Sequence, residues 1–161
     1  MPTVTKQKTP AEALASLMRL CSRAEKSSGD ARRLMRGWGV APSDAERVLA
    51  ELTAKRFIDD ERYANAYTRG KMRASGWGAH KIRAALAAKG IPRELIDNAL
   101  RELIDPDAQS VRLEKQLERK IARVKAATPY ELRTKLTRYA LSLGYDYETA
   151  AEAVEKTVPM S

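Results

Sequence analysis

The fifteen-residue stretch LAAKGIPRELIDNAL, residues 86–100, has two counterparts elsewhere in the chain. MRGWGVAPSDAERVL (35–49) and ALSLGYDYETAAEAV (140–154) share its glycine at the fifth position and the apolar residue that follows. Apolar residues also recur six, nine and ten positions after each glycine, which is the spacing of one helix face. Glycine suits a helix end because it adopts the left-handed conformation at little cost. Each stretch therefore predicts the end of one helix, a glycine turn and the start of another helix.

The three glycines, Gly39, Gly90 and Gly144, lie 51 and 54 residues apart, a period that fits a three-helix repeat. Working outward from them, the apolar periodicity predicts helices at about 10–25, 29–37, 43–56, 59–75, 79–89, 92–104, 106–126, 129–143 and 146–157. No segment alternates with period two, so no sheet is expected. We predict an all-α fold, a tandem array of three three-helix units that is elongated and curved, with units at 9–57, 58–104 and 105–158.

Helix start signals support these boundaries. Residues 9–12 (TPAE), 43–46 (SDAE) and 128–131 (TPYE) are predicted capping boxes, in which a hydroxyl and a Glu carboxylate satisfy free amides of the first turn. Residues 59–61 (DDE) and 105–107 (DPD) place negative charge at two more helix starts, where the helix dipole favours it.

The chain is basic, with a net charge of +9, and residues 55–101 alone carry +6. A basic middle favours an anionic partner, either nucleic acid or an acidic protein surface. A solvated basic surface without a partner explains the charge equally well.

The residues for most catalytic chemistry are missing from the sequence. The chain has one His and one Cys, too few for a His- or Cys-based zinc site, and it contains no phosphate-binding P-loop. His80 is expected in the exposed first turn of a helix, and Cys21 is expected to pack as a small apolar residue. Asp59, Asp60 and Glu61 could hold magnesium through water, but a helix start explains them better. We predict no enzyme, no cofactor and no metal. The sequence MPTVTKQK at residues 1–8 and the lack of long apolar runs predict a cytoplasmic protein without a membrane span.

Basic helices carry the candidate contact residues. On helix 79–89, Ile82 and Leu86 mark the inward face. The opposite face carries only His80 and the small side chains of Ala84 and Ala87. This face either docks a phosphate backbone or an acidic helix, or packs against the next unit. Trp77 either fills a core or stacks on a base or an arginine. The candidates for partner or DNA contact are Arg62, Arg69, Lys71, Arg73, Trp77, Lys81, Arg83, Lys89, Lys115, Arg119, Arg123, Arg133, Lys135 and Arg138.

Two segments resemble a known family. FIDDERYANAY (57–67), a glycine-rich turn and HKIRAALAAKGI (80–91) are similar to the central motif of the regulatory protein RecX family. The residues that match the motif directly are Asp59, Asp60, Arg62, Tyr63, Ala64, Lys89, Gly90 and Ile91. The three-unit layout is similar over about residues 9–158, although SSGDARRLMRGWG (27–39) departs from the family pattern.

The resemblance implies a function that composition does not. RecX-like proteins bind the recombinase RecA, lie in the groove of its filament on single-stranded DNA, and restrain assembly, ATP hydrolysis and strand exchange. They are not enzymes. The expected partners are therefore the RecA filament and single-stranded DNA, with double-stranded DNA a further possibility, and the chain is expected to act as a monomer. The alternatives are a helix-turn-helix-like module that acts on DNA directly and a scaffold that binds protein alone.

Overall fold

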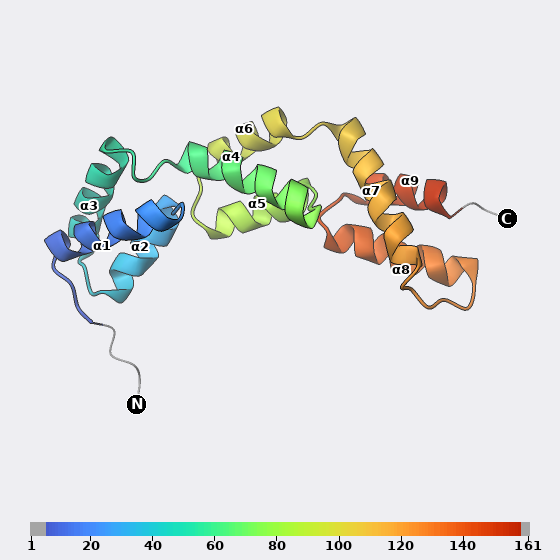
Figure 1. Ribbon diagram of the computed structural model, residues 1–161, viewed down its shortest axis with the longest axis horizontal. Coiled ribbons are helices and arrows are strands. Elements are labelled where there is room, and N and C mark those ends of the chain that lie inside the picture. The colour runs from blue at the N-terminus through green and yellow to red at the C-terminus, as the bar shows by residue number, and fades with distance from the viewer. Residues whose placement is uncertain (1–5, 159–161) are drawn as a thin grey trace. The chain divides into compact units, whose positions relative to one another are not determined.

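The computed structural model describes residues 6–158. Within this range the chain forms nine α-helices and one short π-helical segment, and it contains no strand (Figure 1). In chain order the elements are α1 (Pro10–Arg23), α2 (Ser28–Gly37), α3 (Pro42–Ala54), α4 (Asp60–Gly70), η1 (Lys71–Ser75), α5 (Ala79–Ala88), α6 (Arg93–Leu103), α7 (Pro106–Ile121), α8 (Pro129–Ser142) and α9 (Tyr147–Thr157). The predicted all-α fold of successive three-helix groups is confirmed.

The chain forms two compact units. The first contains the described residues up to Asn65 together with Leu86–Ile96, and the second contains Ala66–Ala85 together with the described residues from Asp97 onward. Helices α4, α5 and α6 each contribute residues to both units. The unit boundaries 9–57, 58–104 and 105–158, and the elongated, curved form, stay predictions.

Each unit has its own apolar core. In the first unit, Leu17 of α1, Met35 of α2 and Leu52 of α3 are fully buried. In the second unit, Leu117 of α7 and Leu136 of α8 are fully buried and join a cluster that also includes residues of α9. Burying side chains of this size supplies the main free energy that offsets the entropy lost when the chain folds.

The glycine turns that define the repeat are present at all three places. Gly39, Gly90 and Gly144 have φ values of +74°, +77° and +98°. In each turn the apolar residue after the glycine donates its backbone N–H to the carbonyl four residues before the glycine: Val40 to Met35 (3.0 Å), Ile91 to Leu86 (3.2 Å) and Tyr145 to Ala140 (3.3 Å). All six of these apolar residues are buried. The turn thus ends one helix and anchors the chain on both sides of the glycine in the core.

Of the predicted capping boxes, the one at 9–12 forms in full. The one at 128–131 is incomplete, because the Glu131 carboxylate accepts from the Ala127 N–H rather than from that of Thr128, and the one at 43–46 is absent. Helix α3 begins at Pro42 with Ala41 as its N-cap, and no side chain caps it. Proline suits the first helical position because its missing N–H would have no partner there and its φ is already helical. The helix therefore begins before Ser43, and the Glu46 carboxylate instead accepts from the Arg32 guanidinium of α2 at 2.8 Å, which lowers the pKa of Glu46.

Other helix boundaries also differ from the prediction. Helix α2 begins at Ser28, one residue early, because Ser27 and Asp30 form a capping box that the sequence analysis missed. Helix α7 ends at Ile121 rather than at residue 126, in a turn of shorter i→i+3 bonds. The predicted helix 59–75 is α-helical only to Gly70 and continues as the π-helical segment η1.

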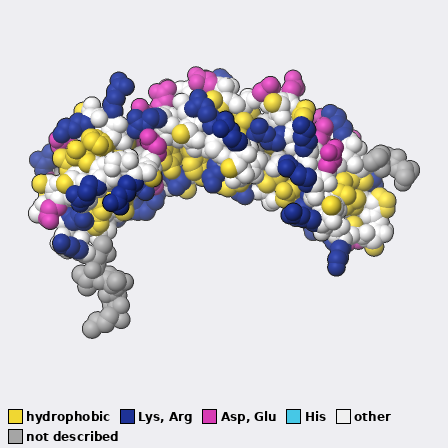
Figure 2. Space-filling model, viewed as in Figure 1, with side chains coloured by type: hydrophobic (Ala, Val, Ile, Leu, Met, Phe, Trp, Pro, Cys, Tyr) yellow, Lys and Arg dark blue, Asp and Glu magenta, His cyan; other side chains and the backbone are white. Residues whose placement is uncertain are grey.

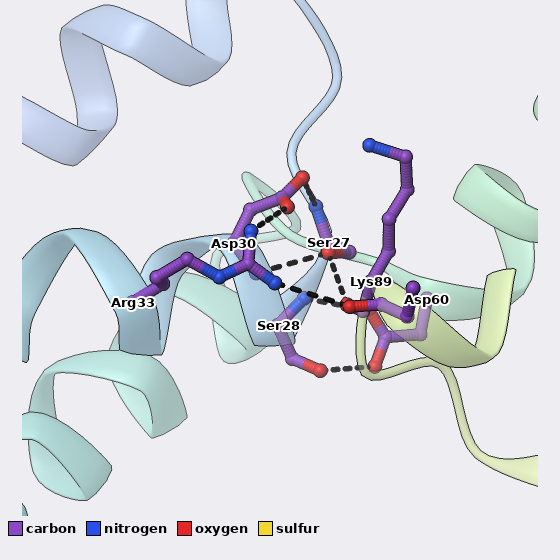
Figure 3. A network of polar contacts seen from close by, with 7 residues as sticks. Ser27, Ser28, Asp30, Arg33, Asp60 and Lys89 are labelled. Carbon is purple, nitrogen blue, oxygen red and sulfur yellow. Dashed lines mark hydrogen bonds and ion pairs between the residues drawn. The ribbon is translucent and has the colours of Figure 1, made fainter. Parts of the chain in front are cut away.

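The start of helix α2 lies directly against the glycine turn after α5, within the first unit (Figure 3). The Ser27 hydroxyl donates to the Lys89 carbonyl at 2.7 Å. A Cβ added at Gly29 would lie 2.1 Å from the same carbonyl oxygen and 2.9 Å from the Gly90 Cα. Only a residue without a side chain permits this approach, so two backbones meet here without any side chain between them.

The second unit contains an equivalent contact. Gly78, which precedes α5, donates its N–H to the Leu143 carbonyl at 2.7 Å, and the His80 N–H donates to the Gly144 carbonyl at 3.0 Å. A Cβ added at Gly78 would lie 2.7 Å from the Gly144 carbonyl carbon. Ser27 and Gly78 each lie twelve residues before their repeat glycine. The start of one middle helix therefore contacts the glycine turn of the next middle helix in both units.

We predict that Gly29→Ala destabilises the protein, because the added methyl group would overlap backbone atoms that cannot rotate away. The expected loss is about 1–3 kcal/mol, typical of overpacking. Gly37→Ala in the same helix is the matched control, since a Cβ there meets nothing within 4 Å. Urea unfolding followed by circular dichroism measures both, and an equal effect of the two substitutions would contradict the close contact.

Candidate nucleic-acid interface

A hollow of about 400 Å³ in the second unit gathers positive charge between η1 and α7. We call it the basic cleft, and its lining residues are Met72, Arg73, Ala74, Ser75, Gly76, Arg112, Gln116, Arg119, Lys120, Arg123 and Tyr139. Five of these described residues are Lys or Arg and none is acidic. Figure 2 shows Lys and Arg side chains gathered over the region of α7. Such a hollow suits a phosphate-bearing ligand, because the closely spaced cations are neutralised by its charges.

The π-helical segment shapes one wall of the basic cleft. The Arg112 guanidinium of α7 donates to the Met72 carbonyl at 2.8 Å, which joins α7 to η1. Gly76 then closes the segment with φ +64°. This left-handed backbone favours glycine, and the Gln116 side-chain amide of α7 lies against the turn, 1.9 Å from where a Cβ would be.

Helix α7 supplies most of the opposite wall. Leu113 and Leu117 are fully buried and fix which side of the helix faces the core. Arg112, Arg119 and Arg123 are spaced by seven and four residues, which is the spacing of one helix side. They therefore follow a common side of α7 and of the turn after it. These three guanidiniums all line the basic cleft.

Aromatic and amide groups complete the basic cleft. The Lys120 ammonium lies 4.8 Å from the centroid of the Tyr139 ring on α8. The Gln116 side-chain oxygen is buried and has no hydrogen-bond partner among the described residues. The basic cleft therefore combines five cations that can contact phosphates with one aromatic ring and one amide side chain.

The structure brings only part of the predicted set together. Arg73, Arg119 and Arg123 line the basic cleft. Arg112, Gln116, Lys120 and Tyr139 line it as well, although they were not among the candidates. The helical spacing of Arg112, Arg119 and Arg123 was the signal available in the sequence. The π-helical turn that brings residues 72–76 against them had no such signal.

Several candidate cations are held by partners within the chain. Arg62 forms an ion pair with Glu25 (2.9 Å), Arg83 with Asp97, and Lys135 with Glu131 (3.1 Å). The paired side chains are about two-fifths exposed, so each bridge adds little to stability. Each bridge nevertheless occupies a charge that was predicted to meet a partner.

Trp77 is half-buried and belongs to neither apolar core. The ammonium groups of Lys71 and Lys81 lie 4.7 and 4.6 Å from its ring centroid, and the Tyr67 ring meets it edge-on at 6.4 Å. Lys81 also donates to the Ser142 carbonyl at 3.2 Å. Lys71 and Lys81 hold the ring through cation–π contacts, and whether the ring fills a core or stacks on a base or an arginine stays a prediction.

The remaining candidates lie apart from the basic cleft. Arg69 and Lys115 are exposed, and Arg133 and Arg138 line a second hollow between α8 and α9. Lys89 belongs to the first unit, where its carbonyl accepts from Ser27. On α5, His80, Ala84 and Ala87 are exposed, as the docking alternative requires.

The motif residues have clear structural contacts in the first unit (Figure 3). The Asp59 carboxylate accepts from the Arg62 N–H at 3.0 Å and caps α4. Asp60 accepts from the N–H (2.8 Å) and the hydroxyl (2.5 Å) of Ser28, at the start of α2. These two carboxylates thus fix the starts of two different helices.

The apolar motif residues are buried around this point. Tyr63, Ala64 and Ile91 are at most 8% exposed. Burial raises the pKa of Tyr63 to about 12, helped by the charges of Asp30 and Glu25, so its ring stays neutral at physiological pH. Gly90 provides the left-handed turn that meets Gly29. The motif therefore builds the contact between α2 and the turn after α5.

Two further features concern the chemistry of the chain. Burial raises the pKa of the Cys21 thiol, so little thiolate forms at neutral pH and the group is a poor nucleophile. Across residues 6–158, His, Cys, Asp and Glu form no cluster of three or more that could ligate a metal, and no helix has the length and apolar character to span a bilayer.

Family models match the two segments that contain the basic cleft. Residues 59–100 match the second three-helix domain of RecX, and residues 107–154 match the third. A regulatory protein RecX of Thermus thermophilus is 37% identical over 101 residues, which are 62% of this chain and 68% of that protein. Regulatory protein RecX of Clostridium perfringens strain 13 is 28% identical over 143 residues, 88% of this chain. The chain spans 66% of the length of that Clostridium protein.

Solved structures share the fold. A crystal structure of RecX from Lactobacillus salivarius superposes with a TM-score of 0.81 at 18% identity, covering 92% of this chain and 96% of that one. A second crystal structure, of a regulatory protein RecX, gives the same TM-score at 21% identity and is covered to 72%.

We predict that Arg119→Ala weakens binding to single-stranded DNA and lowers its salt dependence. Removing one phosphate contact should reduce the slope of log K against log salt by about 0.7 for a single strand. Lys115→Ala is the control on the same helix, exposed but outside the basic cleft. Fluorescence anisotropy of a labelled oligonucleotide across a salt series measures both, and equal slopes for the two variants would rule out a specific role for the cleft.

Proposed function

The chain belongs to the RecX family, and from this membership we propose that it is a regulatory protein that binds the RecA filament on single-stranded DNA and restrains its assembly, ATP hydrolysis and strand exchange. One observation carries the proposal. The two segments that match RecX domains, 59–100 and 107–154, contain every residue that lines the basic cleft. The basic cleft thus lies within the part of the chain that matches the family.

The proposed mechanism is electrostatic and needs no catalytic group. Arg119 and Arg123 contact phosphates of the filament-bound strand or acidic groups of the recombinase surface, since both ligands present closely spaced negative charge. The bound protein then opposes the addition of subunits and the movements that accompany ATP hydrolysis. We propose that it acts as a monomer in the cytoplasm, without a cofactor.

A second candidate function is direct action on DNA as a basic helical module. This function is favoured because no acidic residue lines the basic cleft. The cleft can therefore bind a polyanion such as DNA directly, without a second protein. This alternative predicts that excess DNA removes the protein from the filament, whereas recognition of the filament itself resists that competition.

The internal contacts decide which substitutions test the proposal. Reversing the charge of Lys81 would remove a contact with Trp77 and a bond to the Ser142 carbonyl, and reversing Arg83 would break its pair with Asp97. Loss of function in such variants could reflect altered folding. Arg119 and Arg123 are exposed residues of the basic cleft for which no ion pair is found among residues 6–158, so their reversal leaves the cores intact.

We predict that the protein inhibits the RecA ATPase on single-stranded DNA at well below one copy per recombinase, and that added DNA does not relieve the inhibition. For the double variant Arg119→Glu/Arg123→Glu, the concentration that gives half-inhibition should rise roughly tenfold or more, equivalent to at least ~1.4 kcal/mol of binding free energy. ATP hydrolysis titrated with each protein measures this.

The control for that titration is Arg69→Glu/Lys115→Glu, which changes net charge equally at exposed positions outside the basic cleft. It should inhibit like the wild type. No inhibition by the wild type, or inhibition that extra DNA abolishes, would refute filament recognition and leave the DNA-binding module. Equal loss in both double variants would show that net charge, not the cleft, is responsible.

A further inference from the structure

A second hollow, of about 370 Å³, lies between α8 and α9 in the second unit and exposes two tyrosine rings. Its lining residues are Tyr130, Arg133, Thr134, Thr137, Arg138, Tyr147, Ala151, Val154 and Glu155. Tyr130 is 75% exposed and Tyr147 is 68% exposed. They are the two most exposed large apolar side chains among the described residues, and both line the same hollow.

Both tyrosines lie at the starts of capped helices. Tyr130 is the second residue of α8, directly after Pro129 and the Thr128 cap, whose hydroxyl accepts from the Glu131 N–H at 3.1 Å. Tyr147 is the first residue of α9, and the Asp146 cap accepts from the Thr149 N–H at 2.7 Å. Capped helix starts hold their backbone firmly, so little entropy remains to be lost when a ligand meets the rings.

Two threonines of α8 that line the hollow have their hydroxyls bound within the helix. The hydroxyl of Thr134 donates to the Tyr130 carbonyl at 3.0 Å, and that of Thr137 donates to the Arg133 carbonyl at 2.8 Å. The helix itself therefore satisfies both hydroxyls. Val154, which is 2% exposed, also lines the hollow. The surface is thus suited to the flat face of an apolar or aromatic group.

Two guanidiniums give this surface a positive charge. Arg133 and Arg138 line the hollow, and neither is paired with a carboxylate within residues 6–158. Arg62 and Arg83, in contrast, have carboxylate partners. Glu155 is the single acidic residue among those that line the hollow. Exposed aromatic rings beside unpaired arginines are the combination that single-stranded nucleic acid uses, with bases on the rings and phosphates on the guanidiniums.

We propose that the hollow between α8 and α9 is a binding site for the unpaired bases of single-stranded nucleic acid, which stack on Tyr130 and Tyr147. A duplex does not fit this chemistry, because its base faces are covered by neighbouring pairs. The site deepens the proposed function and rests on it for the source of the strand: the basic cleft holds phosphates, and the tyrosines add contacts to bases. The binding itself requires no recombinase.

The test compares a labelled single-stranded oligodeoxynucleotide with an abasic sugar–phosphate strand of the same length and label. Wild-type protein should bind the strand with bases more tightly, and Tyr130→Ala/Tyr147→Ala should remove most of that preference. The expected loss is roughly five- to 150-fold for each stacked base. The slope of log K against log salt should stay unchanged, because no phosphate contact is removed.

Two further variants test whether the aromatic rings themselves are responsible. Tyr130→Phe/Tyr147→Phe keeps both rings and should retain the preference for bases. Leu141→Ala, which removes an exposed apolar side chain of α8 outside the hollow, should bind like the wild type. Thermal unfolding checks that all variants are folded, which is expected because both tyrosines lie outside the core.

Either of two results would overturn the proposal: equal wild-type affinity for both strands, or an alanine variant that keeps the preference for bases. If such an alanine variant also fails to inhibit the recombinase, the hollow is a protein-binding surface. Failure of the stacking site leaves the proposed function standing as long as the wild type inhibits the RecA ATPase. Conversely, a base preference without ATPase inhibition supports the site and refutes the regulatory proposal.

Discussion

The fold depends on a direct contact between the backbones of two segments. The start of a middle helix lies against the glycine turn that ends the next middle helix, at Gly29 with Gly90 and at Gly78 with Gly144. Hydrogen bonds at the same relative position, from Ser27 to Lys89 and from Gly78 to Leu143, fix the register of each contact. Because no side chain separates the elements, small helices with modest cores are joined firmly within each unit.

The fold followed from the sequence because each of its signals is local. A left-handed residue at a helix end, an apolar residue after it and a proline at a helix start act within a few positions, and the period of the glycines repeats them. The errors arose where two local signals compete. Pro42 starts α3 before Ser43 can cap it, and the extra turn residue of η1 has no counterpart in a 3.6-residue period.

The candidate site was harder to predict, for a physical reason. Arg119 and Arg123 could be chosen from helical spacing, but their meeting with Arg73 depends on the π-helical turn and on the left-handed backbone of Gly76 that ends it. The sequence also does not show which group a given Lys or Arg will contact. Lys81 and Arg83 are as basic as Arg119, yet one holds Trp77 and the other pairs with Asp97. Charge counts find a basic region, whereas tertiary contacts decide which of its charges remain available.

The close contact at Gly29 and Gly90 also bears on how far sequences of this fold can drift apart. What the contact demands is a missing atom, the Cβ of Gly29, and the Ser27 hydroxyl that donates to the Lys89 carbonyl. Outside the residues that make this contact, side chains can change as long as each helix keeps its apolar face. A constraint on so few atoms leaves room for wide sequence change, and the Lactobacillus salivarius structure shares the fold at 18% identity.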